Sequence, residues 1–196
     1  VLKETAGINA VLLTGQLGNS GGLSVADVLT GKQVPSGKLT DTWAKAYADY
    51  PSSEGFSHNN GNIDDEYYTD GIYVGYRYFE TFAKDKVLYP FGYGLSYTNF
   101  ETKAEIFKNT EDELTVAATV TNIGDVRGKE VVQVYVKAPQ GKLGNPARKL
   151  IGFAKTRELA PGEKEELVII IPKYDMASYD DLSLIHISEP TRRVVI

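Results

Sequence analysis

The second half of the chain contains short segments in which apolar and polar residues alternate, and this pattern restricts the possible folds most. The segments are KAEIFK (103–108), ELTVAATVTN (113–122), KEVVQVYVKAP (129–139), RKLIGFAK (148–155) and EKEELVIIIP (163–172). The turn sequences NTED, IGDVRG, QGKLGNP and LAPG separate them. Strands of this length and spacing are typical of two antiparallel sheets packed face to face. We therefore predict an all-β sandwich that begins after Phe100.

The first half of the chain has a different pattern. The apolar run INAVLLT (8–14) has the length of a strand covered on both faces. GLSVADVLTG (22–31) has apolar residues at helical spacing, and Gly31 is a typical helix stop. A strand, a loop and a helix make half of a βαβ unit, and residues 2–4 resemble the end of an earlier helix. We predict the remnant of an α/β domain, in a chain that begins inside a domain because it lacks an initiating Met and a signal-peptide pattern.

The glycine-rich loop GQLGNSGG (15–22) raises the question of phosphate binding. Phosphate binding of this kind needs either GxxxxGK[ST] or GxGxxG directly after a strand. Neither pattern is present in the sequence. The Gly-Lys pair at 31–32 follows the helix, so it lies at the wrong end to bring an anion to a helix N-terminus. We predict instead that Gly18, Gly21 and Gly22 permit a tight turn and close packing.

Composition excludes several functional classes. A net charge of -5 argues against a nucleic-acid partner, and no apolar run approaches the roughly 20 residues that span a bilayer. The chain has no Cys, which excludes disulfides and thiolate metal sites. We expect no cofactor, no metal site and no membrane partner. The compartment stays undecided, with a bacterial cytoplasm slightly favoured over secretion.

The acidic group Asp64, Asp65 and Glu66 raises the possibility of glycoside hydrolysis. That reaction needs two carboxylates roughly 5 to 10 Å apart across the sugar, and three adjacent loop residues cannot be assigned this geometry. A solvated acidic loop is the favoured interpretation, and His58 in SHNNGN is interpreted as a turn residue. We therefore assign no catalytic residue from these groups.

An aromatic segment, GIYVGYRYFETF (71–82), follows this loop, and its alternation favours a strand over a helix. Tyrosine rings stack on sugar faces while their hydroxyls bond sugar hydroxyls. The candidates for substrate binding are Tyr67, Tyr68, Tyr73 and Tyr76, with Tyr78 and Tyr89 as further possibilities. The alternative is that about half of these rings pack the predicted strand against its neighbours.

Three long motifs together resemble glycoside hydrolase family 3, the β-glucosidase family. They are GQLGNSGGLSVADVLTGKQVPSGKLTDTW, YTDGIYVGYRYFETF and LYPFGYGLSYTNF. The resemblance covers residues 1 to about 181. It implies the end of an α/β sandwich domain (1–49), a connecting segment (50–100) and a fibronectin type III-like, immunoglobulin-like sandwich (101–181). Because such a sandwich needs about seven strands and we count five to six, we expect it to lack its last strands.

The resemblance also implies an activity, the retaining removal of a terminal β-linked glucose. The family's nucleophile lies in a barrel domain, and its acid/base Glu lies in a part of the α/β domain that no residue here matches. We therefore expect a non-catalytic fragment whose partners are the barrel domain and, in the full enzyme, a β-glucoside or oligosaccharide. The alternative is a carbohydrate-binding or structural β-sandwich module, and a dinucleotide-binding enzyme is a distant third.

The C-terminal residues 182–196 depart abruptly from the family pattern. LSLIHISEPTR (182–192) resembles the translation of a sequencing adapter, so we expect a non-native tail. Its alternating run LSLIHI (182–187) can still pair with a sheet edge, because backbone hydrogen bonds do not depend on the origin of a sequence. We predict that any such strand is short and that Pro190 stops the pairing.

Overall fold

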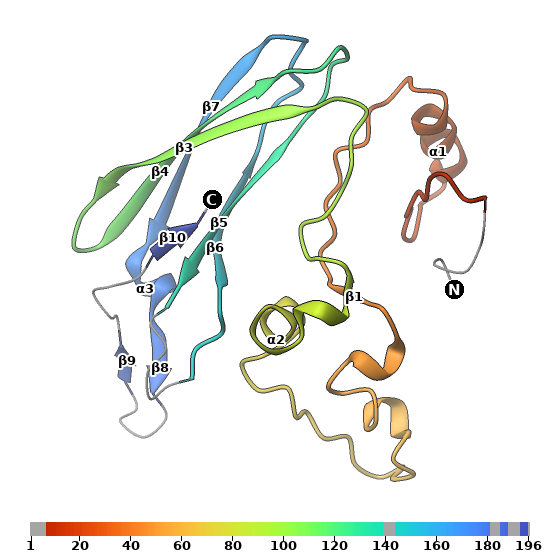
Figure 1. The fold of residues 1–196 in the computed structure, drawn as a ribbon, viewed down its shortest axis with the longest axis vertical. Helices are drawn as coiled ribbons and strands as arrows, with labels where there is room; N and C mark the ends of the chain where they lie inside the picture. The colour runs from red at the N-terminus through yellow and green to blue at the C-terminus, as the bar shows by residue number, and fades with distance from the viewer. Residues whose placement is uncertain (1–6, 139–143, 181–184, 188–192, 196) are drawn as a thin grey trace.

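The computed structural model describes residues 7–138, 144–180, 185–187 and 193–195, and it contains the predicted sandwich beside a long connecting segment (Figure 1). Both sheets of the sandwich are antiparallel. One sheet has the order β3-β4-β7, formed by β3 (Phe100–Asn109), β4 (Glu113–Asn122) and β7 (Lys164–Pro172). The other has the order β10-β5-β6, formed by β10 (Arg193–Val195), β5 (Val131–Lys137) and β6 (Lys149–Lys155). The predicted fold class, an α/β remnant followed by an all-β sandwich, is confirmed.

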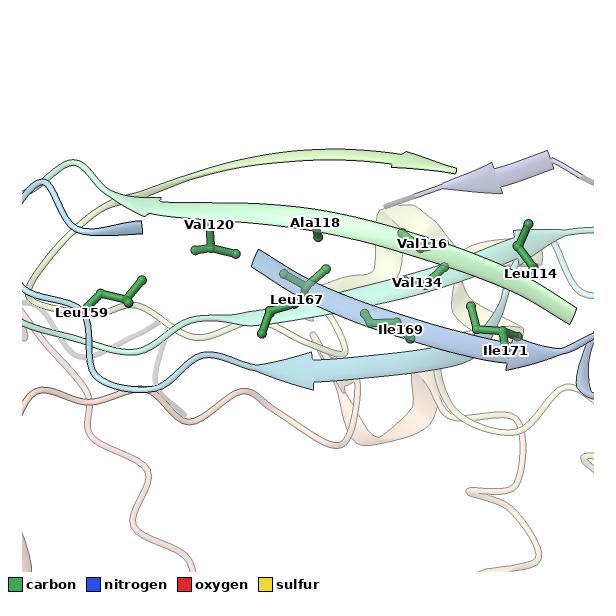
Figure 2. Packing of buried hydrophobic residues seen from close by; sticks show 10 residues of the cluster. Leu114, Val116, Ala118, Val120, Val134, Leu159, Leu167, Ile169 and Ile171 are labelled. Carbon is green, nitrogen blue, oxygen red and sulfur yellow. The ribbon is translucent and has the colours of Figure 1, made fainter. Parts of the chain in front are cut away.

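The core lies between the two sheets, and β4 and β7 supply most of it (Figure 2). Alternate residues of β4, including Val116 and Val120, are fully buried, and Ile171 of β7 lies opposite Leu114 in the strand register. β5 adds Val134 from the facing sheet. The alternation that identified these strands in the sequence is therefore the alternation between core and solvent.

The sandwich has incompletely paired edges in the described residues. β3 borders its sheet, and its Ile106 and Phe107 side chains are exposed. On its outer side β5 pairs only with the three residues of β10, from Lys137 to Tyr135. A sandwich with fewer strands than about seven is expected to leave such edges.

The tail forms two three-residue strands within its described residues. The short strand predicted in LSLIHI is present as β9 (Ile185–Ile187), but it pairs with β8 (Ser178–Asp180) and not with an edge of the sandwich. The second strand, β10, follows Pro190 and was not predicted. Much of the adapter-like stretch, residues 182–184 and 188–192, lies outside the described residues.

The predicted strand at 8–14 is absent, and this prediction was wrong. These residues have no strand partner and are exposed along their whole length. A strand buried on both faces needs neighbouring strands to satisfy its backbone groups, and no described residue of this chain supplies them beside the run. The predicted helical remnant at 2–4 lies outside the described residues.

The predicted helix after the glycine-rich loop is confirmed as α1 (Gly21–Leu29), and Gly31 follows it with a positive φ of 75°. A Cβ at Gly21 would overlap the Leu17 side chain, so this glycine permits close packing as predicted. Gly18 and Gly22 have open space around them. The apolar residues Leu23 and Leu29 of the helix are exposed.

The aromatic segment 71–82 was predicted as a strand, but it forms helix α2 (Tyr76–Phe82). Gly75 precedes the helix at φ 57° and ψ -125°, a conformation that glycine adopts most readily. Phe79 and Ala83, four residues apart, are buried on one face, where Phe79 meets the Tyr50 ring edge-on at 5.5 Å. Helical spacing of the buried residues thus outweighed the strand preference of the individual aromatics.

The remaining elements are short. They are β1 (Trp43–Ala44), η1 (Tyr47–Asp49), η2 (Phe56–His58), η3 (Lys84–Lys86), β2 (Val87–Tyr89) and α3 (Lys173–Met176). β1 and β2 pair with each other and join the end of the first region (1–49) to the C-terminal part of the connecting segment (50–100). Among the described helices, none has the length and apolar character that crossing a bilayer requires.

Candidate functional site

The four tyrosines predicted to bind substrate fall into two groups. Tyr67 and Tyr68 lie in the loop before α2, with 65% and 93% of their surface exposed. Tyr73 and Tyr76 are half-buried at the start of α2 and face the sandwich. The structure therefore does not bring all four rings together into one site.

Tyr73 and Tyr76 use their hydroxyls to bond the backbone of the sandwich. The Tyr73 hydroxyl donates to the Gly144 carbonyl oxygen, and the Tyr76 hydroxyl accepts from the Leu150 N–H at 2.8 Å. The Tyr76 ring also packs on Phe91, with ring centroids 4.7 Å apart. These rings join the connecting segment to the sandwich at Gly144 and at Leu150 of β6. Packing against a neighbouring element was the alternative to sugar binding in the sequence analysis.

Two polar side chains on the next turn of α2 strengthen this contact. Glu80 pairs with Arg148 at 2.5 Å, and the Arg148 guanidinium lies over the Tyr135 ring, 4.6 Å from its centroid. The Thr81 hydroxyl accepts from the Ala147 N–H at 3.0 Å. We call this set the clamp: Tyr73, Tyr76, Glu80 and Thr81 on the connecting segment, with Tyr135, Arg148 and the backbone of 144–150 on the sandwich.

The electrostatics of the clamp keep Tyr135 neutral. Burial raises the pKa of the Tyr135 hydroxyl above its ordinary value, and the nearby Arg148 cation opposes this shift only in part. The hydroxyl donates to Gln133 at 2.9 Å. The guanidinium thus meets a carboxylate on one side and a neutral aromatic face on the other, an arrangement suited to holding two segments together.

A second contact joins residues 37–39 of the first region to the connecting segment and to the sandwich. The Leu39 N–H donates to the Tyr93 carbonyl, and Lys38 reaches both the Gly94 carbonyl at 2.9 Å and Glu130 at 2.8 Å. A Cβ at Gly94 would overlap the Gly37 carbonyl oxygen, so only glycine allows this approach. The backbones around Leu39 and Tyr93, which are hydrogen-bonded to each other, are therefore held beside Glu130 at the start of β5.

A buried asparagine closes the junction where the connecting segment enters β3. Asn122 is fully buried, accepts from the Thr98 hydroxyl at 2.7 Å and donates to the Leu159 and Val126 carbonyls. All polar atoms of its side chain are therefore satisfied, as a buried amide requires. Gly124 completes the junction by donating its N–H to the same amide oxygen.

The acidic residues lie in an exposed loop. Asp64 and Asp65 are exposed, and Glu66 approaches His58 Nδ1 at 3.6 Å. His58 also contacts the Asn62 carbonyl at 2.8 Å and adopts a positive φ, in keeping with a turn residue. Within the described residues no group of three His, Cys, Asp or Glu could hold a metal ion.

Sequence reasoning missed the sandwich side of the clamp. Arg148 and Tyr135 belong to predicted strands that carry no recognised motif. Glu80, the ion-pair partner of Arg148, lies 68 positions away in the sequence. One available signal was the spacing of Tyr76, Glu80 and Ala83, which places all three near one face of a helix. That spacing would have favoured α2 and indicated that Glu80 faces a packed surface.

Comparison with known proteins agrees with this two-part architecture. Residues 1–97 match the glycosyl hydrolase family 3 C-terminal domain, and residues 130–195 match the fibronectin type III-like domain. "Beta-glucosidase A" of Butyrivibrio fibrisolvens is 52% identical over 197 residues, covering 92% of this chain and 23% of the relative.

Two solved structures show the same fold at substantial identity. A beta-glucosidase from Paenibacillus barengoltzii is 52% identical with a TM-score of 0.75, covering 82% of this chain and 18% of its own. Beta-glucosidase 3B from Thermotoga neapolitana, in complex with glucose, is 46% identical with a TM-score of 0.77, covering 82% of this chain and 22% of its own.

The fold thus defines a protein in which a mixed α/β region is followed by a fibronectin type III-like sandwich. The chain belongs to glycoside hydrolase family 3. It spans about a fifth of the length of the relatives that it matches.

Proposed function

We propose that the chain is the non-catalytic, architectural part of a retaining β-glucosidase that removes terminal β-linked glucose. Its homology to family 3 β-glucosidases supports this activity for the whole enzyme. A retaining enzyme needs two carboxylates about 5 Å apart, and the acidic loop offers only exposed ones. Both carboxylates would come from the barrel and α/β parts of the enzyme that match no residue here.

The clamp is the observation that carries this proposal. It joins the connecting segment to the sandwich through an ion pair and three hydrogen bonds, from Tyr73, Tyr76 and Thr81, while a cation–π contact within the sandwich orients Arg148. Contacts of this number restrict rotation of the sandwich about the connecting segment. The chain would thereby hold the sandwich in a fixed position beside the substrate cleft of the enzyme.

A chimera tests this function. The purified chain is assayed for hydrolysis of an aryl β-glucoside, and so is the Butyrivibrio enzyme after its matching region has been replaced by this chain. We expect no turnover by the chain alone and turnover by the chimera. A folded but inactive chimera contradicts the proposal. So does any turnover by the chain alone, and its loss on substitution of Asp64, Asp65 and Glu66 would place the reaction in the acidic loop.

The exposed pair Tyr67 and Tyr68 favours a second candidate, a carbohydrate-binding module. Two neighbouring tyrosine rings in an exposed loop can stack on sugar faces. Retention of the chain on immobilised cellulose or xylan, lost in Y67A/Y68A, would favour this function. Passage without retention, as expected for an architectural part, would exclude it for these polysaccharides.

A further inference from the structure

We infer that a hollow beside the first turn of α2 receives a protein segment from the remaining part of a family 3 enzyme, which brings an acidic or carbonyl oxygen to Arg77. The inference rests on the proposed function and identifies the surface through which the chain would join the rest of the enzyme. The hollow is lined by Asp41, Thr42, Val74, Tyr76, Arg77 and Phe91, among others.

The hollow contains polar groups that have no partner in the described part of the chain. Thr42 is only 5% exposed, and its hydroxyl oxygen is buried without a hydrogen bond. Arg77 is half-buried and takes part in no ion pair or side-chain hydrogen bond there, and Asp41 also has no such contact. An occupant with an acidic or carbonyl oxygen would give the Arg77 guanidinium the partner that it lacks in the described part of the chain.

The walls of the hollow are fixed in place by the clamp. Tyr76 is held on one side by its bond to the Leu150 N–H and on the other by the Phe91 ring. Gly75 has open space where a Cβ would stand, so its positive φ, and not crowding, requires glycine there. Arg77 follows Tyr76 in α2 and lines the hollow. The clamp holds this helix against the sandwich.

The surroundings of the hollow favour a protein segment over a sugar. Val74, which lines the hollow, is 59% exposed, and a monosaccharide that bonded Arg77 would leave this apolar side chain in water. A segment with an acidic or carbonyl oxygen beside apolar side chains would cover both kinds of surface. The relatives provide such a source, because about four-fifths of their length has no counterpart in this chain.

Chemical labelling tests the inference without relying on activity. Phenylglyoxal, which modifies accessible guanidinium groups, is applied to the full chain and to the Butyrivibrio chimera, and Arg77 is followed by mass spectrometry. We expect the labelling rate of Arg77 to fall about tenfold or more in the chimera, because packing blocks the reagent. Arg127, whose side chain is 71% exposed on the sandwich, is the internal control and should label equally in both.

Thermal unfolding of R77Q gives a second measurement. The substitution should lower the midpoint of the chimera and leave that of the chain alone unchanged, because the partner of Arg77 is present only in the chimera. If R77Q prevents the chimera from folding, R77K replaces it, since it keeps the charge and loses the planar fork.

The two proposals fail in different ways. An active chimera in which Arg77 labels as fast as in the chain alone overturns the docking inference and leaves the proposed function standing. Protection of Arg77 that appears only when glucose is added also overturns it, in favour of a sugar site. A folded, inactive chimera contradicts the proposed function whatever the labelling shows.

Discussion

Replacing Arg148 by Met should loosen the connecting segment from the sandwich more than any other single change of charge at the clamp. The substitution removes the ion pair to Glu80 and the cation over Tyr135. Methionine retains much of the aliphatic stem, so the packing against the rings is largely preserved. The measured loss therefore reports on the charge and its geometry.

The expected cost follows from the burial of the pair. The side chains of Arg148 and Glu80 remain 26% and 22% exposed. Exposed pairs contribute about 0.2–1 kcal/mol, and breaking a buried pair costs about 3–5 kcal/mol, so we take about 2 kcal/mol for this intermediate case. The contact with Tyr135 adds about 0.5–1 kcal/mol. We expect R148M to lower the free energy of unfolding by about 2.5 kcal/mol.

Urea unfolding followed by circular dichroism measures this change. With a slope of about 2–3 kcal/mol per M, the midpoint should fall by about 1 M urea. Fluorescence of Trp43, the single tryptophan, reports in the same samples on β1, which pairs with β2 of the connecting segment. The double variant R148M/E80Q should be more stable than the sum of the two single losses predicts, because both remove one shared interaction.

The matched control is Arg127, which pairs with Glu158 at 3.3 Å with side chains 71% and 41% exposed. R127M should cost less than about 0.5 kcal/mol. Equal midpoints for R148M and R127M would refute the view that the clamp holds the two parts together. Strict additivity of R148M and E80Q would refute the direct coupling between these residues.

Three further predictions concern the core, the second contact and pH. Ile171→Ala, at a fully buried position of β7, should cost about 2–4 kcal/mol, measured by the same urea unfolding. Gly94→Ala should lower the thermal midpoint by several degrees because its Cβ would overlap the Gly37 carbonyl, whereas Gly22→Ala, with open space around it, should not. Burial raises the pKa of Tyr135 in the folded chain above its ordinary value of about 10. Its contribution to stability is therefore complete below that pH and is lost as the pH rises through the folded pKa, and Y135F should flatten this alkaline decline.

Local pattern was sufficient to predict the sandwich. Along β4 and β7 every second residue enters the core, so period two in the sequence is directly the period of burial. The same reasoning failed at 8–14, where strand preference is strong but neighbouring strands are missing from the described residues. It failed again at 71–82, where aromatic residues suit both a strand and the face of a helix, and only the packing of Phe79 decides between them.

The candidate site was less accessible to sequence reasoning. The tyrosines were predicted to bind sugar, and the structure shows that Tyr73 and Tyr76 make specific contacts with the sandwich. Their partners lie about 70 positions away in the sequence. No local pattern connects Glu80 with Arg148 over such a distance. The resemblance to the family indicated which domains are present, and the side-chain contacts between them required the structure.

The composition of the clamp makes the two sides unequally tolerant of mutation. Three of its hydrogen bonds end on main-chain groups of the sandwich, at Gly144, Ala147 and Leu150. Any amino acid except proline offers an N–H, so substitutions at Ala147 and Leu150 leave the bonding groups in place. Gly144 differs, because its φ of 57° favours glycine and a Cβ there would lie 3.2 Å from the Tyr73 hydroxyl. Loss of a hydroxyl at Tyr73 or Tyr76 deletes a bond outright. In a library of random substitutions, changes at Ala147 and Leu150 other than proline should therefore be retained more often than changes at Tyr73, Tyr76 or Gly144.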